Sequence, residues 1–228
     1  EGVARPGDAL RGRGPRVTGD VVVLVPDKDT EQTIQAVLAR PKSLGIRALS
    51  SRILVHPQKD PGCYGTGAEL LRTQLRSWRH GLVLFDRAWE GAPSGEREVL
   101  ERKVQTDLDQ MQSGWGRCIV IDPELEVWMF SESPRLDEAL GWSGRTPDLR
   151  AWLRAEGEWP EGMPKPPDPE RAFRKAMYEV RLPAAASLFG AVARTVSLVR
   201  CHDASFVALV EQLRAWFPPA ASLPSGRD

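Results

Sequence analysis

Carboxylate side chains recur just after short apolar segments of the sequence. Each segment is rich in Val, Ile, Leu or Phe, the composition of a strand that is buried on both faces of a parallel sheet. Parallel strands bring their carboxyl ends to one edge of the sheet, so we expect these acids to converge there. Carboxylates in one crevice repel each other and lose hydration, and a hard cation such as Mg²⁺ or Mn²⁺ offsets both effects. The predicted metal ligands are Asp86, Glu124 and Glu126, with Asp86, Asp27 and Glu31 as the candidate catalytic acids.

Each acid also fits an ordinary structural role. Asp27 fits a turn, and Thr30 fits the N-cap of a following helix. Glu124 and Glu126 are spaced to share one face of a strand, which suits joint ligation and also a solvated strand face. Asp86 is the strongest candidate, because an acid that abuts a buried strand needs a partner.

Charge is segregated along the chain although the formal net charge is zero. Residues 40–80 hold eight basic and two acidic residues, whereas residues 81–140 hold six basic and thirteen acidic residues. A neutral chain is unsuited to coating polyanions generally, so any nucleic-acid contact must be a local patch. The side chains predicted for such a patch are Arg72, Arg76 and Arg79, spaced to share one helix face, and Lys165.

The elements that must position these groups alternate between strand and helix. Strands are expected at 21–25, 46–55, 82–85 and 117–121, with further pairing through 127–129. Helices are expected at 31–40, 67–79, 95–112, 169–180, 184–198 and 203–216. This alternation predicts an α/β fold with a doubly wound, mainly parallel sheet and a C-terminal helical elaboration. The expected divisions are a poorly ordered leader (1–19), the α/β domain (20–132) and the helical elaboration (133–228).

Composition excludes several classes of protein. The chain has 228 residues, 41% of them hydrophobic and eight of them Trp, enough to build a sizeable core. No apolar run approaches the roughly 18 residues of a membrane span, and no signal-peptide core follows the basic N-terminus, so we predict a soluble cytoplasmic protein without membrane contact. Three widely spaced Cys form neither a disulfide framework nor a zinc motif. There is no Gly-rich phosphate loop and no GxSxG elbow.

Three short stretches resemble the TOPRIM-like proteins that bacteria encode beside ATPases in phage-defence loci, and in particular a component of methylation-associated defence systems. These stretches are Val25–Glu31, Leu82–Arg87 and Ile121–Trp128, and the tail from Cys201 to Phe217 also resembles the closing helix of the family. The resemblance therefore extends over nearly the whole chain, although each motif is short and degenerate. It implies a TOPRIM-like sheet, a Mg²⁺ or Mn²⁺ cofactor, and ATPase or methylase subunits as partners.

Two departures from the TOPRIM pattern affect the predicted site. Asp27 stands where the family has a glutamate after the first strand. After the third strand the family has Asp-x-Asp, and this chain has Asp86-Arg87-Ala88, so one potential ligand is missing. Either Glu124 and Glu126 replace it or catalysis has been lost.

The resemblance thus implies a Mg²⁺-dependent nuclease of DNA or RNA within a defence complex. One alternative is a non-catalytic subunit that docks an ATPase or methylase through the aromatic residues of its helical tail. A second alternative is a phosphatase of the haloacid-dehalogenase type, because Asp27-Lys28-Asp29-Thr30 after an apolar strand resembles the DxDxT opening of that family. The cap and the paired aspartates of that family are not recognisable here.

Overall fold

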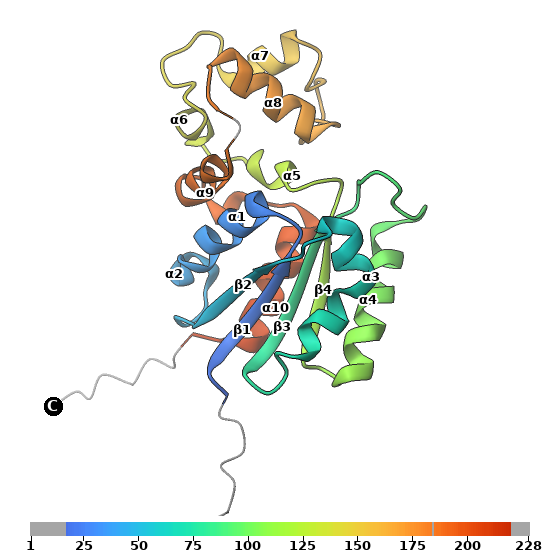
Figure 1. Ribbon diagram of the computed structural model, residues 1–228. Helices are drawn as coiled ribbons and strands as arrows, with labels where there is room; N and C mark the ends of the chain where they lie inside the picture. The colour runs from blue at the N-terminus through green and yellow to red at the C-terminus, as the bar shows by residue number, and fades with distance from the viewer. Residues whose placement is uncertain (1–16, 184, 220–228) are drawn as a thin grey trace, which may run out of the picture.

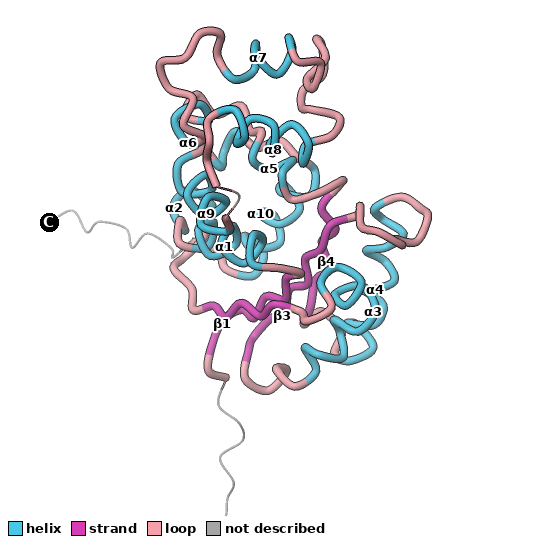
Figure 2. Tube along the Cα trace, turned by 45° about the horizontal axis from the view of Figure 1, so that its top comes forward, coloured by secondary structure: helices cyan, strands magenta, loops and turns pink. Residues whose placement is uncertain are grey.

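A four-stranded, all-parallel sheet forms the centre of the protein, with strands in the order β2-β1-β3-β4 (Figure 1). The computed structural model describes residues 17–183 and 185–219. The strands are β1 (Gly19–Val25), β2 (Ser51–Val55), β3 (Trp78–Asp86) and β4 (Gly116–Ile121). Helices cover both faces of the sheet, which confirms the doubly wound α/β fold with additional C-terminal helices (Figure 2).

The helices fall into those that connect the strands and those that follow β4. The first group is α1 (Lys28–Leu38), α2 (Pro41–Leu44), α3 (Lys59–Arg72) and α4 (Arg97–Met111). The second group is α5 (Glu126–Met129), α6 (Leu136–Ala139), α7 (Leu149–Ala155), α8 (Pro169–Glu179), α9 (Ala186–Thr195), the 3₁₀ turn η1 (Leu198–Arg200) and α10 (Ala204–Trp216). No helix in the described ranges is long and apolar enough to cross a membrane.

Alternation along the strands divides the core into two layers. Val21, Val23 and Val25 of β1 face a cluster that includes side chains of α1, α9 and α10. Val22 and Leu24 face the other cluster, which α3 and α4 complete. All five of these side chains are fully buried. A central strand of mostly β-branched residues is therefore buried on both faces, as its composition predicts.

The last helix of the described chain packs on the sheet itself. In Figures 1 and 2, α10 lies on the same face of the sheet as α1. Trp216 at its end stacks on His80 of β3, with ring centroids 4.3 Å apart and an interplanar angle of 9°. Helices α5 to α8 instead lie beyond the carboxyl ends of the strands, at the top of Figure 1.

The N-terminus of α1 differs from the prediction. Asp27, not Thr30, caps this helix, because its Oδ1 accepts hydrogen bonds from the backbone N–H of Thr30 at 2.8 Å and from the Thr30 hydroxyl at 2.9 Å. The helix begins at Lys28, three residues before the expected start.

Helix α3 also begins earlier than expected, at Lys59, and ends at Arg72. The proline and glycine near its start are typical of a loop, yet both suit the helix that forms. Pro61 lies in the first turn, where its missing N–H has no helical partner. A Cβ on Gly62 would lie 2.0 Å from Nδ1 of His56, so glycine allows close packing there.

Two expected strands are also shorter or absent. β2 begins at Ser51 rather than at residue 46, because the preceding residues form α2 and a loop. Residues 127–129 belong to α5, so the predicted strand pairing there is wrong. Glu124 consequently lies in the turn before α5 and Glu126 is the first residue of α5, so the two residues do not share one strand face.

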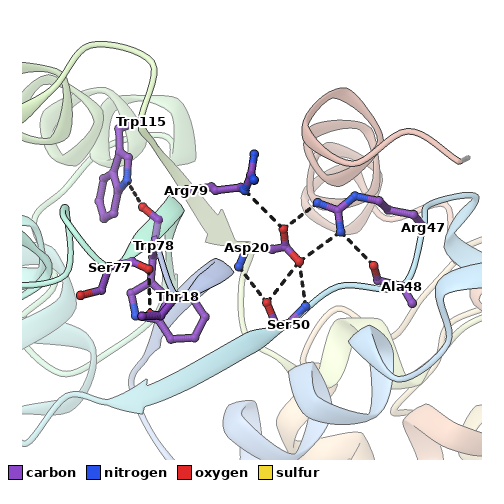
Figure 3. Close-up of polar contacts among 9 residues, drawn as sticks. All are labelled: Thr18, Asp20, Arg47, Ala48, Ser50, Ser77, Trp78, Arg79 and Trp115. Atoms are coloured by element: carbon purple, nitrogen blue, oxygen red, sulfur yellow. Dashed lines mark hydrogen bonds and ion pairs between the residues drawn. The ribbon is translucent and has the colours of Figure 1, made fainter. Parts of the chain in front are cut away.

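A network around Asp20 holds the amino ends of the strands together (Figure 3). Its Oδ1 accepts a hydrogen bond from Nη2 of Arg47 at 2.6 Å, and its Oδ2 accepts one from the backbone N–H of Ser50 at 2.9 Å. Arg79 of β3 lies 3.8 Å from the same carboxylate, which is only 14% exposed. These interactions, led by the hydrogen bond from Arg47, hold the pKa of Asp20 well below its usual range.

We expect Asp20→Asn to lower the free energy of unfolding by about 1–3 kcal/mol at pH 7, because the hydrogen bonds of a buried charged group are lost. A depressed pKa stabilises the fold above the unfolded value of about 3.9 and ceases to do so as pH falls through the folded value. The difference between wild type and variant in urea melts should therefore shrink below about pH 4. Glu138→Gln, in the exposed pair with Arg135, is the control and should leave the melts unchanged.

Candidate functional site

The carboxyl ends of β1 and β3 flank the place where the sheet changes winding direction. The connection from β1 to β2 runs through α1 on one face, and the connection from β2 to β3 runs through α3 on the other. In open α/β sheets such a reversal leaves a crevice outside the strand ends, where ligands bind. Asp27 follows β1 and Asp86 is the last residue of β3, so both lie at this reversal of winding.

Asp86 has the most unusual environment of any acid in the described chain. Its Oδ1 is buried and has no hydrogen-bond partner. Burial raises the pKa of this carboxyl well above its usual value, and the charges of Asp60, Glu126 and Asp27 raise it further. The backbone N–H of Leu125 offsets only part of this effect. A buried oxygen without a partner costs about 1–3 kcal/mol, so this position is not explained by stability.

Asp60 joins the site from the first turn of α3. Its Oδ1 accepts a hydrogen bond from the backbone N–H of Asp86 at 2.9 Å. Burial raises its pKa, and the charge of Asp27 adds to the effect, while Lys59 lowers it. Lys59 also lowers the pKa of Asp29, which burial raises. The backbone of Lys59 has φ of +51°, a left-handed conformation that non-glycine residues adopt rarely and that often marks functional positions.

Glu124 and Glu126 belong to the segment that leads from β4 into α5. Burial raises the pKa of each to about 7, and in both cases the charge of Glu170 contributes. The charge of Glu124 raises the pKa of Glu126 in turn. Both carboxyls therefore titrate near neutral pH and not in the usual acidic range.

Arg87 fixes the loop that carries these glutamates. Its backbone N–H donates to the carbonyl oxygens of Ile121 at 2.7 Å and Pro123 at 3.0 Å, and its Nε donates to Oδ1 of Asp122 at 2.5 Å. Arg87 thus ties the end of β3 to the end of β4.

Helix α8 places further charges opposite the sheet edge. Asp168 caps this helix, accepting a hydrogen bond from the N–H of Arg171 at 2.9 Å, and Glu170 lies in its first turn. Both raise the pKa of Glu124, whereas Arg174 lowers it. The C-terminal helices therefore act on the electrostatics of the acidic residues and do not only pack against the sheet.

The structure does not bring every predicted residue to this site. Glu31 forms a surface pair with Lys28, at 2.6 Å, and its role as ligand or base stays a prediction. Lys165 donates to the carbonyl oxygen of Val127 at 2.6 Å, and its side chain is 18% exposed. It anchors the Pro-rich segment to α5 and is not a free phosphate contact.

The prediction that Arg72, Arg76 and Arg79 share one helix face is wrong. Arg72 ends α3, Arg76 lies in the following turn, and Arg79 belongs to β3. Because α3 begins beside Asp86 and rises ~1.5 Å per residue, its end lies about 20 Å away, near the amino ends of the strands. These arginines therefore lie too far away to contact a phosphate that is held at Asp86.

Asp60, Lys59 and the acids of α8 were not predicted from the sequence. Like Asp86, Asp60 is an acid close to the end of an apolar strand, and this position is what could have identified it. The Pro and Gly after it indicated a loop instead, so it was not counted among the site residues. The acids at the start of α8 had no such signal, because only the tertiary fold brings them over the sheet edge.

A divalent cation fits the chemistry of this site. The buried Asp86 oxygen has no hydrogen-bond partner, and the acidic groups around it carry carboxylate oxygens, the ligand atoms that Mg²⁺ and Mn²⁺ prefer. Within the described residues, no three His, Cys, Asp or Glu side chains form a ready-made metal-binding group. Mg²⁺ commonly uses one or two carboxylates and takes its other ligands from water and substrate phosphates. Asp86 would supply the first ligand, with Asp60 or Glu126 as the second.

The comparisons with known proteins add no relative: no family model, no curated protein and no solved structure matches the chain.

We expect Asp86→Asn to stabilise the metal-free protein. In the folded protein the surroundings of Asp86 disfavour its negative charge, whereas in the unfolded chain the charge is solvated by water. Replacing the carboxylate by the isosteric amide therefore removes a penalty that only the folded state has. A raised pKa penalises the folded state increasingly as pH rises above about 3.9. The melting temperature of the variant should therefore exceed that of the wild type at pH 7.5, by about 2–4 °C for each kcal/mol, and match it near pH 4. A lower melting temperature at pH 7.5 would contradict this account of Asp86.

Glu126→Gln should have a similar but displaced pH dependence. Because the folded pKa is about 7, the penalty in the wild type grows from about pH 4.5 to about pH 7 and is constant above that. The melting-temperature difference between variant and wild type should rise over this window and then level off. Glu138→Gln is the control, because Arg135 lowers the pKa of Glu138, and this variant should show no such rise.

Proposed function

We propose that this protein is a divalent-cation-dependent phosphodiesterase of the TOPRIM-like kind that acts on DNA or RNA within a phage-defence complex. The observation that carries the chemical part of the proposal is the buried, unpartnered Oδ1 of Asp86 among Asp60, Glu126 and Asp27. The defence context and the ATPase or methylase partners rest on the resemblance of the sequence motifs alone.

The residues suit hydrolysis of a phosphodiester in distinct ways. A bound Mg²⁺ or Mn²⁺ would neutralise the charge that develops on the phosphate. Asp86 and Asp60 would hold it, and the hydrogen bond from the Asp86 N–H to Asp60 fixes their relative position. Glu126, with a pKa of about 7, has the right proton affinity to accept a proton from an attacking water at neutral pH. Lys59 adds a positive charge beside Asp60, which favours an anionic substrate there.

A non-catalytic docking subunit is the second candidate. It is favoured by the lack of a ready-made three-ligand group within the described residues. The phosphatase alternative gains no such support. Asp27, the first acid of its motif, uses Oδ1 to accept two hydrogen bonds from Thr30 as a helix cap.

The two candidates predict different outcomes for purified protein, or its reconstituted complex, incubated with DNA and RNA. A phosphodiesterase should cleave in the presence of Mn²⁺ or Mg²⁺, and Asp86→Asn or Glu126→Gln should reduce the rate by ~100-fold or more, a loss of about 2.7 kcal/mol of transition-state stabilisation. Arg76→Ala, in the turn before the amino end of β3, is the control that should retain full activity. A docking subunit should give no metal-dependent cleavage, and its variants at Asp86 should still protect cells.

Metal binding has a readout that is independent of cleavage. A cation that binds only the folded state stabilises it by RT ln(1 + [M]/Kd) and so raises the melting temperature. Mn²⁺ should therefore stabilise the wild type and leave Asp86→Asn unchanged. An equal shift in both proteins would place the cation elsewhere and overturn the assignment of Asp86.

A further inference from the structure

The two edges of the sheet differ in how their backbone groups are satisfied. The outer edge of β4 is closed by side chains of α4. The N–H of Cys118 donates to Oε1 of Gln105 at 3.0 Å, and Nε2 of Gln105 donates to the carbonyl oxygen of Gly116, also at 3.0 Å. The N–H of Val120 donates to Oε1 of Glu101 at 3.0 Å. Another strand cannot pair with β4 without displacing these side chains.

The opposite edge, formed by β2, has no such cover. The N–H of His56 donates to the carbonyl oxygen of Val25 at 2.9 Å, so His56 directs its backbone groups toward β1. Strand geometry alternates these directions, and Ser51, Ile53 and Val55 therefore direct their N–H and C=O groups away from the sheet. No partner for these groups occurs within the part of the chain that the structure describes. Three apolar side chains of this edge strand, Ile53, Leu54 and Val55, are only partly buried.

We propose that the β2 edge is a homodimer interface, in which β2 pairs antiparallel with β2 of a second copy about a two-fold axis at Ile53. This pairing joins the two sheets into one continuous sheet across the dimer. The closed β4 edge limits the assembly to a dimer, because no second free edge is left in the described sheet for a further copy.

The sequence of β2 is self-complementary in this register. Ser51 lies opposite Val55 of the second copy, and Ile53 lies opposite its own equivalent. The backbone N–H and C=O groups that point away from each sheet then form about six hydrogen bonds between the two copies. Arg52 lies opposite Leu54 of the second copy rather than opposite another Arg52. Like charges directly across a pair are thereby avoided, and the aliphatic part of the arginine covers the leucine.

Charge does not oppose a second copy at this edge, because the register keeps the two Arg52 side chains from lying directly opposite each other. The edge carries one cation, Arg52, and the Asp20 carboxylate that lies nearest the start of β2 is already engaged by Arg47 and Ser50. The remaining residues of the strand are uncharged. Another short apolar strand with a polar first residue suits them, and β2 itself has that composition.

The test is residue-resolved amide hydrogen exchange of the full chain over a range of protein concentrations, combined with the mass from light scattering. The amides of Arg52 and Leu54, which face β1, should be protected at every concentration. The amides of Ser51, Ile53 and Val55 should exchange fast in dilute protein and become protected as the mass doubles. Protection of these three amides at every concentration would show that the same chain covers the edge, and fast exchange at every concentration would show an unpaired edge; either result overturns the proposal.

Proline substitutions provide matched variants. Ile53→Pro removes an outward N–H and spares the ladder to β1, so it should abolish the dimer and keep the circular dichroism of the wild type. Leu54→Pro removes an N–H that faces β1, so it should unfold the protein or lower its melting temperature sharply. Ser51→Pro, at an exposed position, serves as a second dimer-breaking variant if Ile53→Pro does not fold. A folded proline variant that still dimerises contradicts the proposed pairing.

Discussion

Burial of β1 on both faces is the constraint on which the rest of this structure depends. A strand of consecutive Val and Leu residues cannot be left open to water on either side, so helices must cover both faces. All-parallel pairing follows, since each connection crosses a face as a helix. Parallel pairing in turn places every strand end on one side, and this geometry brings Asp27 and the acid after β4, Glu126, close enough to Asp86 to act on its pKa.

A partly buried carboxylate lies at each end of the sheet, and the two have opposite surroundings. At the amino ends, Asp20 is surrounded by Arg47, Arg79 and Ser50, and its charge is fully compensated (Figure 3). At the carboxyl ends, Asp86 has other acids as neighbours and a buried oxygen with no partner. One acid stabilises the fold and the other destabilises it. This asymmetry is the physical reason to assign a function to the second end.

Local sequence pattern predicted most elements, and it failed where tertiary contacts decide. The apolar strands, the helix at 97–111 and the three long C-terminal helices could be predicted because their periodicity is strong. Helix α3 could not be placed correctly, because its glycines are needed for packing against His56 and Leu24 and not for a turn. Asp86 was identifiable as an acid that abuts a buried strand. Asp60, Lys59 and the acids of α8 were not, because contacts between distant segments bring them to the site.

The position of α10 imposes an order on the folding of the chain during synthesis. Residues up to β4 contain every strand of the described chain and both helices of one face, so α3 and α4 can cover that face as soon as β4 has left the ribosome. The other face needs α9 and α10, and Phe217 at the end of α10 also accepts a backbone hydrogen bond from Arg47. Almost a hundred residues separate β4 from that contact, and until they emerge α1 and α2 cover only part of this apolar face of the sheet. Apolar surface that is exposed in this interval is prone to aggregation, so the late arrival of α9 and α10 is the vulnerable stage in the synthesis of this chain.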